Sequence, residues 1–140
     1  MNIFIRGTIA GIISGTILGL FLKAIEQTVG TKVYTLLLNV DYIPYVKDLT
    51  LSEPIEFIMH LIISIILGIG LLYLVKRNKW SNREILIRVT IISFVIGILL
   101  YPTTALSVRT PSITSIEAIV FWLIGHIGYG SVLGSLLFRK

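Results

Sequence analysis

The sequence predicts an all-α integral membrane protein: a four-transmembrane-helix bundle, N-in/C-in, with a short interfacial helix in the first outer loop. Three observations predict this fold. Hydrophobic residues make up 55% of the 140 residues and charged residues only 14%, which is too little charge to cover the surface of a soluble domain. Four apolar stretches are each long enough to cross a bilayer, which takes ~20 residues. The basic residues gather on one side of these stretches.

The chain is expected to form a single membrane domain, residues 1–140. Its predicted membrane helices and loops are helices 3–26, 54–75, 85–101 and 115–138, outer loops 27–53 and 102–114, and inner loop 76–84. No small-x-small cleavage pattern follows the first apolar run, so we expect a retained helix rather than a signal peptide. Ser52 and Pro54 suit the N-cap and first turn of the second helix. Thr114 and Glu117 have the spacing of a capping box before the fourth helix.

The charge distribution predicts the orientation. One side carries eight basic residues and one acidic residue: Arg6, Lys76, Arg77, Lys79, Arg83, Glu84, Arg88, Arg139 and Lys140. The other side carries four basic and six acidic residues: Lys23, Glu26, Lys32, Asp41, Lys47, Asp48, Glu53, Glu56, Arg109 and Glu117. Because cytoplasmic loops retain Lys and Arg, both termini are expected in the cytoplasm. Topology therefore explains the net charge of +5, and we expect no nucleic-acid partner.

The location is expected to be a bacterial cytoplasmic membrane, in which the protein is multi-pass. The chain has 26 Ile and 4 Ala, a bias typical of an AT-rich bacterial genome. It has no cysteine, so disulfides and thiolate metal sites are excluded.

The first outer loop is long for so small a protein, and long loops are usually functional or disordered. It is rich in apolar and aromatic side chains. Val33, Leu36, Leu37 and Val40 have helical spacing, and Tyr34, Tyr42 and Tyr45 suit the headgroup zone. A short helix lying on the outer interface is the expected structure.

Glycines form a groove on the first helix, where they recur every fourth residue at Gly7, Gly11, Gly15 and Gly19. Small residues in this pattern let another helix backbone approach closely. Two interpretations stay open: packing within the monomer, and docking of a second copy or of a partner membrane protein.

The only two histidines lie inside predicted membrane helices. His60 shares a stripe with Glu56 and Ser64, and below His126 lie Gly130 and Gly134. Ionisable residues in a membrane are costly and face the bundle interior. In one interpretation the imidazoles are structural and hydrogen-bonded to neighbouring helices. In the other they line a proton-responsive or ligand- or lipid-binding pocket that opens outward, with Glu56 at its mouth.

Two cofactor interpretations are weaker, and we expect neither a cofactor nor a metal. Helix rise places His60 roughly 9 Å deep and His126 roughly 16 Å deep, whereas the axial ligands of one haem iron should lie at similar depth. Two histidines with Glu56 could also hold zinc. Arg109 could neutralise Glu56 or contact an anionic lipid.

The chain carries no recognisable catalytic motif. There is no Gly-rich phosphate loop, metalloprotease pair or nucleophile elbow. We therefore expect a non-enzymatic membrane protein with membrane lipid as its partner. The alternative is a structural or accessory subunit that docks a partner through its glycine-lined helix.

Several short motifs are spread over the chain: the segment 7–14, the segment 60–64 followed by Gly70, the pairs Tyr101-Pro102 and Gly125-His126, and the basic end Arg139-Lys140. In these motifs the chain resembles the YagU-like family of bacterial inner-membrane proteins, whose function is not defined. The sequence departs from the family pattern at Trp122, where an acidic residue can stand. The resemblance implies four membrane helices and a role for the two histidines, and it implies no activity.

Overall fold

The computed structural model describes residues 2–46 and 49–138. Lys47, Asp48, Arg139 and Lys140, whose charges entered the orientation argument, lie outside the described residues. The elements in chain order are α1 (Ile3–Val29), α2 (Val33–Leu38), α3 (Glu53–Asn78), α4 (Asn82–Leu100), the 3-10 helix η1 (Tyr101–Leu106) and α5 (Ile116–Leu136).

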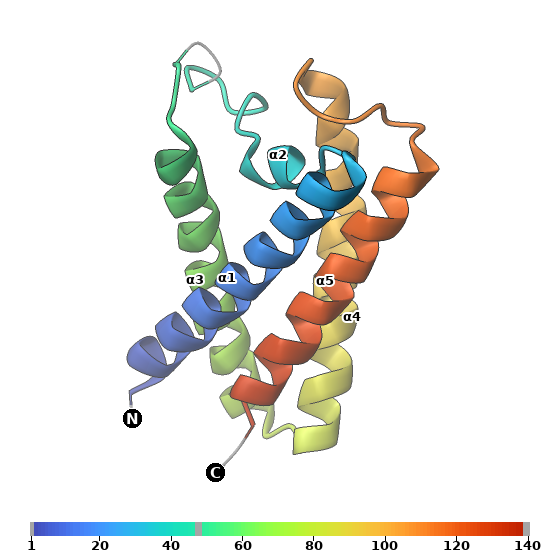
Figure 1. Ribbon diagram of the computed structural model, residues 1–140. Coiled ribbons are helices and arrows are strands. Elements are labelled where there is room, and N and C mark those ends of the chain that lie inside the picture. The colour runs from blue at the N-terminus through green and yellow to red at the C-terminus, as the bar shows by residue number, and fades with distance from the viewer. Residues whose placement is uncertain (1, 47–48, 139–140) are drawn as a thin grey trace.

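Four of these helices confirm the predicted fold. α1, α3, α4 with its extension η1, and α5 are long and apolar enough to cross a membrane. Both termini and the α3–α4 connection lie at one end of the bundle, and α2 and the other connections lie at the opposite end (Figure 1). The segments assigned to the cytoplasm by their charge therefore lie together at one end of the bundle, as expected when the chain crosses the membrane four times.

The predicted capping box at Thr114 and Glu117 is wrong. Ser115 is the N-cap of α5, and its hydroxyl accepts from the Ala118 backbone N–H at 3.3 Å. The Thr114 hydroxyl instead bonds Ser112, and α5 starts one residue later than the box requires. Ser52 does occupy the N-cap of α3, although its side chain makes no capping hydrogen bond.

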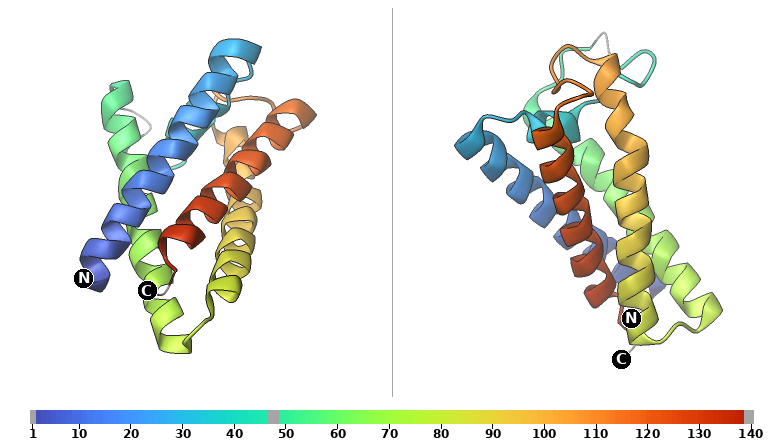
Figure 2. Two further views of the ribbon diagram at one scale, coloured as in Figure 1. Left: turned by 60° about the horizontal axis from the view of Figure 1, so that its bottom comes forward. Right: turned by 90° about the vertical axis from the view of Figure 1, so that its right-hand side faces the viewer.

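The long helices form two pairs. α1 packs along α3, α4 packs along α5, and the pairs meet along α1 and α5 (Figures 1 and 2). Among the described residues, α3 does not pack along α4, although only residues 79–81 join them. The bundle is therefore not closed on the side between α3 and α4.

Glycines bring the paired helices into close contact. A Cβ on Gly11 would lie 2.6 Å from the Ser64 carbonyl oxygen, and one on Gly7 would lie 2.6 Å from Ile69 Cα. On α5, a Cβ on Gly130 would lie 2.7 Å from Thr90 Cα of α4. Gly15 and Gly19 also face α3, and Gly134 faces α4. The groove of α1 is thus filled by α3, which favours packing within the monomer.

The short helix α2 lies against the outer end of the bundle. It contacts α1, α3 and α5, and its Val33 and Leu36 are buried. The Glu26 carboxylate at the end of α1 accepts from the Thr35 N–H at 2.8 Å and from its hydroxyl at 2.7 Å. The predicted helix is present, and these contacts fasten it to α1.

Candidate functional site

A cavity of about 260 Å³ lies between α3 and α4 and reaches α1, α5 and the first outer connection. Its wall is mainly apolar. The polar side chains in the wall are Asn39, Tyr42, Glu56, His60, Ser64, Ser93, Thr103, Trp122, His126 and Tyr129. The structure therefore brings together Glu56, His60, Ser64 and His126, four of the five residues predicted for a pocket.

The cavity differs from the predicted pocket in where it opens. Residues 36–40, 42 and 43 form part of its wall, so the chain that includes α2 covers its outer end. Ile62 and Ile63 of α3 also line the cavity, and both are about half exposed on the helix surface, at 50% and 52%. The expected opening to the outer face is thus covered, because α2 turns apolar side chains inward. The cavity instead reaches the surface that faces lipid.

His60 is oriented by the backbone of α1. Its Nε2 lies 3.3 Å from the Gly15 carbonyl oxygen. Because a carbonyl only accepts, a neutral His60 carries its proton on Nε2 and leaves Nδ1 as an acceptor. Among the described residues, Nδ1 has no hydrogen-bond partner, so His60 retains one acceptor for another group.

His126 is oriented by its own helix and by α4. Its Nδ1 lies 2.8 Å from the Trp122 carbonyl oxygen, and the centres of the His126 and Trp122 rings are 4.4 Å apart. The Trp122 indole N–H donates to the Gly97 carbonyl at 2.8 Å, and a Cβ on Gly97 would lie 2.8 Å from His126 Cγ. These contacts hold the imidazole in place and leave its Nε2 as an acceptor without a partner in the described part of the chain.

Ser64 has a structural role. Its hydroxyl donates to the Gly11 carbonyl at 2.7 Å and lies 2.8 Å from the Tyr129 hydroxyl. Since the single Ser64 proton goes to Gly11, Tyr129 is the donor in the second bond. The predicted polar stripe of α3 is therefore used partly for packing against α1 and α5.

Two buried polar groups in the wall have no partner. Ser93 is 0% exposed and Asn39 is 2% exposed, and neither Ser93 Oγ nor Asn39 Nδ2 has a hydrogen bond in the described residues. A buried unsatisfied group costs about 1–3 kcal/mol. Neither residue was among those predicted to line a pocket. Ser93 stands as a polar residue inside the third apolar run, which was a usable signal, whereas nothing in the sequence distinguished Asn39.

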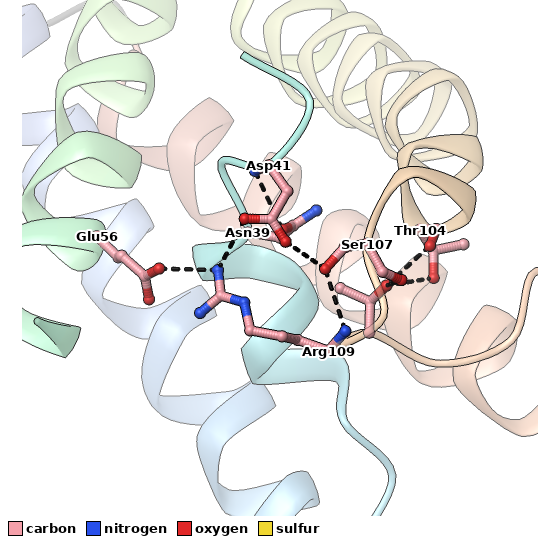
Figure 3. Close-up of polar contacts among 7 residues, drawn as sticks. Asn39, Asp41, Glu56, Thr104, Ser107 and Arg109 are labelled. Carbon is pink, nitrogen blue, oxygen red and sulfur yellow. Dashed lines mark hydrogen bonds and ion pairs between the residues drawn. The ribbon is translucent and has the colours of Figure 1, made fainter. Parts of the chain in front are cut away.

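An ion-pair cluster joins the two outer connections beside the cavity. Glu56 is buried, and its Oε1 accepts from Arg109 Nη2 at 2.9 Å (Figure 3). The same nitrogen lies 3.4 Å from Asp41 Oδ1, and Ser107 donates to the other Asp41 oxygen. The hydrogen bond to Glu56 raises the pKa of Arg109 above its ordinary value. Of the two roles predicted for Arg109, neutralisation of Glu56 is present.

A second, more polar cavity of about 290 Å³ lies on the outer side. Its wall contains Lys23, Glu26, Gln27, Tyr34, Thr35, Leu38, Glu53, Glu56 and Arg109. Lys23 donates to Glu53 at 2.5 Å, and Tyr34 donates to the same carboxylate oxygen at 3.0 Å. Two of the four basic residues assigned to the outer side, Lys23 and Arg109, thus line one cavity.

The residues of the zinc interpretation do not assemble. No group of three His, Asp or Glu side chains that could hold a metal ion is present in residues 2–46 and 49–138. Glu56 is committed to Arg109, and each imidazole bonds a backbone carbonyl. The described geometry therefore does not fit a zinc site made of these three residues.

Comparison with known proteins found no match among protein-family models, curated proteins or solved structures. The resemblance to the YagU-like family stays a prediction. The function must therefore be inferred from the cavities and the side chains that line them.

Proposed function

We propose that this multi-pass protein of a bacterial cytoplasmic membrane is a non-enzymatic binding protein that holds one amphiphilic molecule from the bilayer between α3 and α4. The observation that carries the proposal is a pair of buried atoms, Asn39 Nδ2 and Ser93 Oγ, which have no hydrogen-bond partner among the described residues and whose side chains line a largely apolar cavity. Their cost is offset when a ligand supplies the missing hydrogen bonds.

The cavity has the size and lining for such a ligand. An engineered cavity of about 150 Å³ binds benzene, and the cavity here measures about 260 Å³. Ligand sites are mostly apolar with a few placed polar groups, which describes this wall. In the described part of the chain α3 and α4 do not pack along each other, and Ile62 and Ile63 are half-exposed, which supports entry from the lipid.

The polar groups indicate which ligand chemistry fits. The Asn39 amide offers N–H donors, and Ser93 offers one donor and an acceptor. His60 and His126 each keep one ring nitrogen as an acceptor. A ligand with an apolar body and oxygen atoms that accept hydrogen bonds, such as the ester groups of a glycerolipid, would satisfy Asn39 and Ser93.

The two rival functions receive less support. The accessory-subunit alternative relied on the groove of α1, and α3 of the same chain already fills that groove. A proton-responsive pocket remains compatible with the two free ring nitrogens. It does not account for the apolar wall or for the unpartnered Asn39 and Ser93.

Tryptophan quenching tests the proposal, because Trp122 lines the cavity and Trp80 is the only other tryptophan. In detergent, a monoacylglycerol with a dibrominated chain should quench Trp80→Phe protein, which keeps Trp122, along a saturating curve. Ser93→Ala in this background should weaken that binding about fivefold, the equivalent of one neutral hydrogen bond of about 1 kcal/mol.

Two controls make the test specific. Ser135→Ala removes a hydroxyl that donates to Ser131 within α5 and lies outside the cavity, so binding should not change. Trp122→Phe protein, which keeps Trp80, should show only unsaturable collisional quenching. Unsaturable quenching of Trp122, or no effect of Ser93→Ala, would exclude a bound ligand at this cavity.

A further inference from the structure

We propose that the outer cavity binds the headgroup of the same amphiphile, and that this headgroup carries a phosphate and a primary ammonium, as in a phosphoethanolamine lipid. The inference rests on the proposed function and names the class of ligand. It assigns Lys23 and Arg109 to the phosphate and the neighbouring glutamates to the ammonium.

The two cavities adjoin one another. Leu38 and Glu56 line both of them. The largely apolar cavity extends from these residues between the membrane helices, and the polar cavity lies on the outer side of them. Leu38 belongs to the segment that covers the outer end of the first cavity. A phospholipid with its chain in the first cavity would therefore bring its headgroup to the second where the Leu38 side chain moves aside.

Arg109 is prepared for an additional anion. Both of its ion pairs, with Glu56 and Asp41, use the same nitrogen, Nη2. Its Nε and Nη1 have no hydrogen-bond partner among the described residues, and its side chain is 44% exposed. The two faces of a guanidinium group that offer parallel N–H groups both include Nη2, and this nitrogen already pairs with Glu56 and Asp41. Nε and Nη1 are therefore each free to donate a single hydrogen bond to a phosphate oxygen.

Lys23 supplies a second cation in the same wall. Its ammonium donates to Glu53 at 2.5 Å and lies 5.1 Å from the centre of the Tyr34 ring. An ammonium has three donors, and the side chain is 39% exposed. Lys23 can therefore contact a phosphate without giving up its contact with Glu53.

The charge of the cavity favours a zwitterion over an anion. Its wall holds two cations, Lys23 and Arg109, and three carboxylates, Glu26, Glu53 and Glu56. A phosphodiester alone would add a negative charge to a wall that is already net negative. An attached ammonium cancels that charge and can donate to the carboxylates, whose oxygens accept more than one hydrogen bond. A trimethylated ammonium has no N–H to donate.

The test compares lipids that differ only in the headgroup. Dibrominated phosphatidylethanolamine, phosphatidylglycerol, phosphatidylcholine and diacylglycerol are added to full-length Trp80→Phe protein in detergent, and quenching of Trp122 is titrated. We expect phosphatidylethanolamine to bind about tenfold more tightly than the other three, the equivalent of one charge-assisted hydrogen bond. Free phosphoethanolamine should compete more strongly than inorganic phosphate.

Two variants test the assigned cations. Lys23→Gln and Arg109→Gln should each weaken phosphatidylethanolamine about tenfold and leave diacylglycerol binding unchanged. Arg109→Gln leaves the buried Glu56 without its partner. If that variant does not fold, Lys23→Gln still tests the assignment. Arg88→Gln is the matched control, since Arg88 pairs with Glu84 outside both cavities.

The outcomes separate the two proposals. Saturable quenching by diacylglycerol without preference for phosphatidylethanolamine overturns the headgroup inference and leaves the proposed function intact. No saturable quenching by any lipid overturns the proposed function. Equal competition by inorganic phosphate and phosphoethanolamine assigns the outer cavity to phosphate alone and also overturns the inference.

Discussion

The Tyr129 hydroxyl of α5 donates to Ser64 Oγ of α3 across 2.8 Å, and Ser64 in turn donates to the Gly11 carbonyl of α1. This chain of hydrogen bonds connects three helices in the middle of the bundle. It is also a direct polar link between α5 and α3, which belong to different helix pairs. Its two hydroxyls form part of the wall of the inner cavity.

Tyr129→Phe should lower the free energy of unfolding by about 0.6 kcal/mol and by no more than about 1.7 kcal/mol, the range measured for hydrogen bonds between membrane helices. The variant leaves the Ser64 bond to Gly11 in place. Tyr73→Phe is the control, because Tyr73 is exposed on the same bundle. Equal stability of Tyr129→Phe and wild type, measured by reversible unfolding in mixed micelles, would show that the link contributes nothing.

Gly11→Ala should destabilise the pairing of α1 with α3, because the new methyl group would lie 2.6 Å from a backbone oxygen of α3 that cannot move alone. The expected cost is about 1–3 kcal/mol. Gly70→Ala is the matched control, since a Cβ there has nothing within 4 Å. Thermal unfolding in detergent compares the two. A Gly11→Ala protein as stable as Gly70→Ala would contradict the close packing.

Arg6→Gln should weaken the attachment of the C-terminal end to α1. The Arg6 guanidinium donates to the Leu136 carbonyl at 3.1 Å and to the Phe138 carbonyl, which supplies partners for carbonyls that the end of α5 leaves free. Loss of hydrogen bonds to a charged group should cost about 1.5 kcal/mol. Arg83→Gln, an exposed change on the same side of the bundle, should cost less. Hydrogen exchange at the end of α5 reports the difference directly.

Cysteine labelling tests the orientation, and the chain has no native cysteine to interfere. Cysteines replacing Tyr45 and Val108, both highly exposed, should react with an impermeant thiol reagent added to whole cells. A cysteine replacing Asn78 should react only after the membrane is opened. The reverse pattern would show that the basic end of the bundle faces outward.

High pH should reveal the environment of Tyr34. Burial, followed by the hydrogen bond to Glu53, raises the pKa of the Tyr34 hydroxyl from 10.0 to about 12. The folded protein holds this proton more tightly than the unfolded chain. The stability linked to Tyr34 is therefore complete below pH 10 and is lost as the pH rises through 12. Tyr34→Phe should reduce this loss, and Tyr45→Phe should not. Tyrosinate absorbance should show a late-titrating component that decreases in Tyr34→Phe.

The local sequence was sufficient to predict the spans and the interior faces. Apolar runs of membrane length cannot be accommodated in water, and ionisable residues such as His60 and His126 cannot face lipid without a large cost. These constraints act on each helix separately. They therefore predicted four helices, a short outer helix and inward-facing histidines before any helix was placed against another.

Only the tertiary structure decided which helices touch and what lies between them. The glycine repeat of α1 suits any close-packed partner, and the contact with α3 resolved its role. Likewise, Lys23 has the spacing to pair with Glu26, yet it bonds Glu53, while Glu26 accepts from Thr35. Pairings of this kind depend on positions distant in the chain. The cavity arises because α3 and α4 diverge, and no residue pattern within either helix encodes that space.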